Sequence, residues 1–140
     1  SREGRRMSYF RSKPAARRQL GLGVDLISSG VYTPTWTIIA NLDAITGAQS
    51  MYMRVGDIVT VSGQIAIDPT AGAVCRARAT LPIASNLGST ADCMGVVGSA
   101  SFGEAGAIIG DTTNDAADLF LLAAATSNHA CGFTFQYRVI

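Results

Sequence analysis

The sequence predicts an all-β domain: a jelly-roll-like antiparallel β-sandwich of about eight strands, preceded by an extended N-terminal arm. Three observations support this fold class. Several segments alternate apolar and polar residues with period two, as half-buried strands do. Clusters of Gly, Pro, Asn and Asp separate these segments, as turns do. The 140 residues suffice for one domain with its own core, and we assign residues 1–30 to the arm and 31–140 to the sandwich.

The first twenty residues are strongly basic. They carry seven basic residues and one acid, a formal charge of +6, whereas residues 21–140 carry four basic and nine acidic residues, a charge of −5. Such asymmetry indicates an arm that binds an acidic partner. With too little apolar content for its own core, the free arm should be flexible. Its candidate contact residues are the basic side chains and two aromatic anchors: Arg2, Arg5, Arg6, Tyr9, Phe10, Arg11, Lys13, Arg17 and Arg18.

The first half of the sandwich contains two clear strands and two weaker ones. Residues 31–39 and 49–55 are the weaker candidates. Residues 57–67 form the clearest strand, with the apolar face Val59, Val61, Gly63, Ile65 and Ile67. Residues 73–81 repeat the pattern, with Cys75, Ala77, Ala79 and Leu81 on one face. Turn-forming residues at 54–57 and 68–72 separate these strands.

The second half ends on another clear strand. Residues 93–102 and 107–111 are weaker candidates, and residues 84–92 read as a loop. Residues 118–123 lie in an Ala- and Leu-rich stretch with helical propensity. Turn-forming residues flank that stretch, so we predict a strand there. The last strand presents Phe133, Phe135, Tyr137 and Val139 on one face.

The composition indicates a charge-poor surface. Charged residues make up 15% of the chain, against about 25% in an average soluble domain. The chain also contains 15 Gly and 21 Ala, so Val, Ile, Leu and Ala should fill most of the core. A surface with so few charges must be solvated by Ser, Thr, Asn and backbone groups, or covered by other protein.

The potentially reactive side chains form no recognisable site. Cys75, Cys93 and Cys131 are odd in number and widely spaced, which favours buried free thiols over a disulfide framework. His129 lies among turn-forming residues, which predicts a solvent-exposed loop histidine. One histidine with scattered cysteines lacks the paired ligand spacing of a zinc site. His129 and Cys131 share a strand face but have no third residue to orient them for nucleophilic catalysis.

The carboxylates at 111–118 do not form a regular calcium loop either. Asp111, Asn114, Asp115 and Asp118 are close together, but the loop lacks Gly at its sixth position and Glu at its twelfth. We interpret them as a polar hairpin turn. The sequence contains no P-loop, GxSxG or HExxH motif. We therefore expect no catalytic residues, no metal and no cofactor, which means that the protein is not an enzyme.

Four segments together resemble a β domain found widely in structural proteins of tailed phages. They are residues 52–63 (YMRVGDIVTVSG), 67–70 (IDPT), 81–86 (LPIASN) and 133–140 (FTFQYRVI). The resemblance covers roughly residues 31–140, and its most specific part is 52–63. With the arm in front, the whole chain looks most like a capsid cement, or decoration, protein of a short-tailed phage with an HK97-type shell.

The resemblance implies a structural role without catalysis. Such proteins lie on the outer surface of the capsid, where they bridge major capsid proteins and stabilise the shell against the pressure of packaged DNA. We expect self-association as a dimer at two-fold joints, with a trimer as the alternative, because isologous contacts match two-fold symmetry. We expect no direct contact with nucleic acid and none with a membrane. Two other functions remain open: a trimeric tail- or head-fibre tip that binds a host receptor, and a nucleic-acid-binding protein that acts through the arm.

Overall fold

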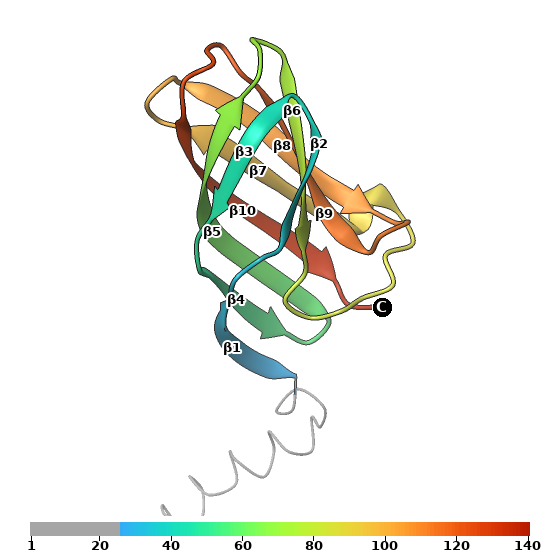
Figure 1. Cartoon of the computed structure of the whole chain (residues 1–140). Helices are drawn as coiled ribbons and strands as arrows, with labels where there is room; N and C mark the ends of the chain where they lie inside the picture. The colour runs from blue at the N-terminus through green and yellow to red at the C-terminus, as the bar shows by residue number, and fades with distance from the viewer. Residues whose placement is uncertain (1–25) are drawn as a thin grey trace, which may run out of the picture.

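The structure, a computed structural model, describes residues 26–140 (Figure 1). It contains one 3-10 turn, η2 (Thr90–Asp92), and the following strands: β1 (Ile27–Tyr32), β2 (Trp36–Ala40), β3 (Leu42–Gly47), β4 (Ser50–Val55), β5 (Ile58–Pro69), β6 (Val74–Thr80), β7 (Cys93–Ser99), β8 (Glu104–Asp111), β9 (Ala116–Leu122) and β10 (His129–Arg138). Among these residues, no helix is long and apolar enough to cross a membrane.

The expected all-β antiparallel class is confirmed. All ten strands belong to one sheet of order β1-β4-β5-β10-β7-β8-β9-β6-β2, and β3 pairs with β5. The sheet curls on itself (Figure 1). Trp36, on the last strand of this order, packs edge-on against Phe133 of the central strand β10, with ring centroids 5.5 Å apart. The two halves of the curled sheet therefore enclose a common core.

Strands β5 and β10 form the middle of this core. They pair antiparallel from Ile58 opposite Arg138 to Ile67 opposite His129. The predicted alternation is confirmed in both strands, because one side is buried at nearly every second residue. Phe133, Phe135 and Tyr137 stack along the inner side of β10, and the intervening residues face outward.

Ten strands are present where about eight were expected. The segment 31–39 does not form one strand, because β1 ends at Tyr32 and β2 begins at Trp36, with Pro34 between them. Proline has no N–H to continue a strand ladder. Strand β1 also begins at Ile27, within the range assigned to the arm. The predicted strand at 118–123 is confirmed as β9 (Ala116–Leu122), because residues 116–121 pair on both sides, with β6 and β8.

Strand β3 was not expected from the sequence. It follows β2 directly at Asn41, whose φ of 57° lies in the left-handed region that Asn tolerates better than most residues. The Asn41 amide group donates hydrogen bonds to the carbonyl oxygens of Ala71 and Ala73, at 2.9 and 3.1 Å, and accepts one from the Ala71 N–H. One side chain thus ties the β2–β3 corner to the β5–β6 turn.

The loop between β6 and β7 is held by side chains from other elements. The Asp115 carboxylate accepts hydrogen bonds from the backbone N–H groups of Ser85 and Leu87, at 2.9 and 3.1 Å. The Tyr137 hydroxyl donates to the Ile83 carbonyl oxygen at 2.7 Å and accepts from the Ile83 N–H at 3.0 Å. Burial is the main reason that the pKa of Tyr137 rises to about 12. The segment expected as a loop at 84–92 is therefore ordered through specific bonds.

Candidate functional site

Three rows of side chains cross the outer side of the sheet, opposite the core, on strands β1, β4, β5, β10 and β7. The strand register sets these rows. The first contains Val31, Met51, Ser62, Thr134 and Val96, the second Ser29, Met53, Thr60, Gln136 and Met94, and the third Ile27, Val55, Ile58 and Arg138. We call these fourteen residues the outer face.

The outer face exposes many large apolar side chains. Eight of its residues belong to this class, and their exposed fractions run from 38% at Ile58 to 64% at Met51. Arg138 is its one charged residue. Contiguous exposed apolar patches on soluble proteins mark contact sites for proteins, membranes or ligands. Covering this face requires little desolvation of charge, which is the main cost of burying ionic surface.

A polar strip divides the outer face into two apolar parts. It consists of Thr60, Ser62, Thr134 and Gln136 on the central strands β5 and β10. The Thr134 hydroxyl donates to the Val61 carbonyl oxygen at 2.9 Å, which satisfies one of these polar groups. Beside the strip, a hollow of about 320 Å³ opens toward β1 and β4. It is lined by Ser29, Met51, Tyr52, Met53, Thr60 and Ser62.

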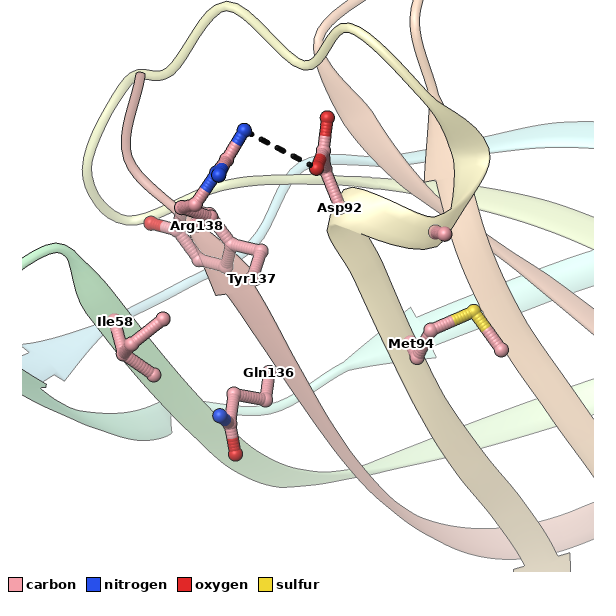
Figure 2. Close-up of a pocket in the computed structure, with 7 residues that line it drawn as sticks. Ile58, Asp92, Met94, Gln136, Tyr137 and Arg138 are labelled. Atoms are coloured by element: carbon pink, nitrogen blue, oxygen red, sulfur yellow. Dashed lines mark ion pairs between the residues drawn. The ribbon is translucent and has the colours of Figure 1, made fainter.

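A second hollow lies at the Arg138 end of the outer face (Figure 2). Its volume is about 430 Å³, and Ile58 and Met94 form apolar parts of its lining. The Arg138 guanidinium pairs with the Asp92 carboxylate at 3.7 Å. Asp92 is itself fixed, because its other oxygen accepts the N–H groups of Gly88 and Ser89 at 3.0 and 2.9 Å. Asp92 offsets much of the charge of this guanidinium, so the hollow offers N–H donors beside an apolar lining, which suits a polar ligand.

The outward-facing side of β6, β8 and β9 carries charged residues, whose opposite charges pair with one another. Arg78 Nε lies 2.6 Å from Asp111 and 3.0 Å from Asp118. Arg76 lies 3.7 Å from Asp118 and stacks over the Phe120 ring at 4.6 Å. These charges pair with one another, so this surface offers few free ions to a partner.

The polar turn predicted between 111 and 118 is confirmed. Asp111 accepts hydrogen bonds from the N–H groups of Thr113 and Asn114, at 3.0 and 3.1 Å, and closes the β8–β9 hairpin. Burial alone would raise the pKa of Asp111, but these bonds and the Arg78 guanidinium hold it below its ordinary value. Within residues 26–140, no three His, Cys, Asp or Glu side chains are grouped so that they could hold a metal ion.

The prediction that His129 is a solvent-exposed loop residue is wrong. His129 begins β10 and is fully buried. Its Nε2 lies 2.7 Å from Oε1 of Glu104, a close polar contact that does not meet hydrogen-bond geometry. Its Nδ1 contacts the Ser127 carbonyl oxygen, and the Phe102 ring stacks on it at 4.0 Å. The turn-forming neighbours were read correctly, but the burial comes from Glu104 and Phe102, which are distant in sequence.

The interpretation of the cysteines as buried free thiols is confirmed. Cys75, Cys93 and Cys131 are all unpaired and buried. Burial raises the pKa of Cys93 to about 12 and that of Cys131 to about 11. It also raises the pKa of Cys75, although Asn41 opposes this effect. Because the thiolate is the nucleophile, these protonated thiols are poorly suited to covalent chemistry at neutral pH.

This arrangement predicts that a thiol reagent will not label the native protein. At pH 8, Ellman's reagent should titrate fewer than one thiol per chain in buffer and all three in guanidinium chloride. The reason is that the thiols are both inaccessible and protonated. Rapid titration of one thiol in buffer would show that the corresponding side chain is exposed.

The nine predicted arm residues, from Arg2 to Arg18, lie outside the described residues. The contact surface that sequence reasoning missed is the outer face. A signal for it is present at residues 51–55, where Met51, Met53 and Val55 occupy the side of a strand that should be polar. Residues 94 and 96, Met and Val, repeat that signal on β7.

Comparisons with known proteins bear on the fold. No protein family matches the chain, and no curated protein is significantly similar to it in sequence. Among solved structures, it is similar to the reovirus attachment protein sigma1, whose crystal structure is a complex with α-2,3-sialyllactose. The TM-score is 0.50 and the identity 12%, over 81% of this chain and 66% of the sigma1 chain. The chain thus spans slightly less than two thirds of that structure, and at this identity the similarity shows the fold alone.

Proposed function

We propose that this protein is a non-enzymatic structural protein of a virion, which decorates the outer surface of a phage capsid and cements neighbouring major capsid proteins. The observation that carries the proposal is the outer face, with its eight exposed apolar side chains and single charge. A surface of this kind is typical of a site that another protein covers, because covering it removes apolar side chains from water. The resemblance of residues 52–63 to a β domain of tailed-phage structural proteins suggests that the partner is a capsid protein.

The chain offers two candidate contact surfaces of different chemistry. The basic arm, with a charge of +6 over residues 1–20, suits acidic protein surface. The apolar outer face suits an uncharged surface. In the sequence, six residues separate this basic segment from β1, a strand of the outer face. Linked contacts of this kind, repeated over a symmetric shell, produce high avidity from weak individual contacts.

The proposed role requires no catalytic site, cofactor or metal. The buried thiols and buried His129 favour a role without catalysis, cofactor or metal. The partners are the major capsid protein and other copies of this chain, without direct contact with nucleic acid or a membrane. The outer surface of the capsid in the virion is the corresponding location.

Deleting residues 1–20 tests the decoration proposal. We expect the truncated protein to keep its β-type circular dichroism spectrum and to lose co-sedimentation with capsids, because the arm supplies most of the positive charge. Met51→Lys should also weaken co-sedimentation. Leu122→Lys is the matched control, since Leu122 is 61% exposed on β9, away from the outer face. Normal decoration by both the deletion and Met51→Lys would show that neither surface binds the capsid.

A receptor-binding tip of a trimeric tail or head fibre is the second candidate. The hollow beside Arg138 favours it, because guanidinium N–H groups beside an apolar lining suit a polar ligand, and the similar sigma1 structure is that of an attachment protein. A stable trimer that binds host cells through Arg138 but ignores capsids would support this candidate over decoration. Tight DNA binding that persists at about 200 mM salt would instead support a nucleic-acid-binding protein.

A further inference from the structure

Strand β1 has one open edge. Strand β4 pairs with one side of β1, and no strand within residues 26–140 pairs with the other side. At the opposite end of the sheet order, the pairing of β2 with β6 contains a register shift between Ile38 and Ala40, and such an irregularity blunts an edge. Exposed edges in monomeric proteins are usually blunted by charged residues, proline or bulges. The β1 sequence, ISSGVY, contains no charge and no proline, and its pairing with β4 is regular.

We propose that β1 pairs, edge to edge and antiparallel, with β1 of a second copy of this chain. The two sheets then continue as one across a two-fold axis. The inference identifies the self-contact of the proposed decoration protein and to that extent rests on the proposed function. An antiparallel pair of identical strands is isologous, so it closes as a dimer.

The alternation of side chains selects the register of this pairing. Residues directly opposite one another in an antiparallel pair must point to the same side of the sheet. One residue of β1 must therefore lie directly opposite the same residue of the other copy, with the two-fold axis between them. When Ser29 lies opposite Ser29 of the other copy, Ile27 of each copy lies opposite Val31 of the other, which gives two apolar pairs. Centring on Ser28 or Gly30 instead places Ser29 opposite one of these apolar side chains. The Ser29 register is thus the one that pairs apolar residues with apolar residues.

The neighbours of β1 support this register. Within each copy, Val31 lies opposite Met51 and Ile27 opposite Val55. The new pairs would therefore join the outer faces of the two copies into one continuous apolar surface. Because β1 carries no charge, the two-fold axis brings no like charges together.

The alternative occupants of the edge fit less well. Residues 1–20 of the same chain place seven basic side chains and Pro14 in a segment that would have to match Ile27 and Val31. A strand from a capsid protein would need apolar residues at the spacing of Ile27 and Val31. A second copy of β1 carries the same two residues at that spacing.

A cysteine at the axis tests the register. In Ser29→Cys the two new thiols lie opposite each other, at Cα separations of about 4.5–5.5 Å, within the range of a disulfide. We expect most of this full-length variant to form a covalent dimer under mild oxidation at low micromolar concentration, as seen on a non-reducing gel. Ser28→Cys is the matched control, because it lies on the same strand but opposite Gly30, and it should remain largely monomeric on that gel. The native thiols are buried and should not interfere.

A charge on the edge supplies the second measurement. Ile27 and Leu122 are both 61% exposed. By sedimentation velocity, the wild type and Leu122→Lys should be dimers at about 100 μM, and Ile27→Lys should be a monomer. A monomeric or trimeric wild type, equal crosslinking of the two cysteine variants, or no crosslinking at all would overturn the β1 pairing. Capsid decoration by a protein that fails these tests would leave the proposed function intact, whereas a crosslinked dimer that ignores capsids would refute only that function.

Discussion

Gly106→Ala should destroy most of the stability of this fold, with a loss of about 4 kcal/mol or more in the free energy of unfolding. Gly106 lies on β8, opposite Val97 of β7 and Leu121 of β9. A Cβ atom there would lie 1.9 Å from the Phe120 carbonyl oxygen, 2.9 Å from its carbonyl carbon and 3.0 Å from the Leu121 Cα. These are backbone atoms of a paired strand, so relief requires β8 and β9 to separate.

The measurement is thermal and urea unfolding followed by circular dichroism. Gly132→Ala is the control, because a Cβ atom at Gly132 meets nothing within 4 Å, and neither glycine has a positive φ. It should change the stability by less than about 1 kcal/mol and favour folding, since alanine restricts the unfolded chain. Equal stability of the two variants would mean that β8 and β9 are not packed at this spacing.

Glu104→Ala should lower the free energy of unfolding by about 1–3 kcal/mol, because it leaves the buried His129 imidazole without its polar neighbour. The Glu104 side chain is 5% exposed and that of His129 is fully buried. The second Glu104 oxygen accepts the N–H of Ala124, so the same carboxylate also holds the connection between β9 and β10. Removing it leaves the Ala124 N–H without its acceptor and the buried His129 Nε2 without a polar neighbour, and an unpaired buried polar group is costly.

Two controls separate this effect from simple loss of charge. Asp57→Ala removes a carboxylate that is 68% exposed and 3.9 Å from Arg54, so it should change the stability by no more than about 1 kcal/mol. The double variant Glu104→Leu with His129→Phe replaces both partners by apolar groups and should be more stable than Glu104→Ala. If the double variant is the less stable of the two, the cost comes from packing and not from an unpaired buried group.

The central strands could be predicted from the sequence because their pattern is local. Alternation placed Val61 and Ile65 on the inner side of β5, and Phe135 on that of β10. The turn at Asp111 was also predictable, since its carboxylate bonds to residues two and three positions later. Each of these features depends on neighbours within a few residues.

The missed features depend on contacts between distant parts of the chain. Strand β3 pairs with β5, and the corner before it depends on Asn41 reaching Ala71, thirty residues later. His129 is buried by Glu104, whose distance in sequence hides the pair. The outer face was missed for a related reason. Met51 and Val96 are apolar on the side of their strands that should be polar, but only the register of five strands brings them onto one surface.

The position of β10 at the centre of the sheet has a consequence for biosynthesis. Strand β5 must pair with β10 across about sixty intervening residues, and in the sheet the meander β7-β8-β9 is connected to β5 only through β10. Until Arg138 has left the ribosome, the nascent chain holds two half-sheets with exposed apolar sides and no strand to join them. Long-range pairing of this kind folds slowly. Folding should therefore follow release of this strand from the ribosome, and the half-sheets are the natural substrates for chaperones during translation.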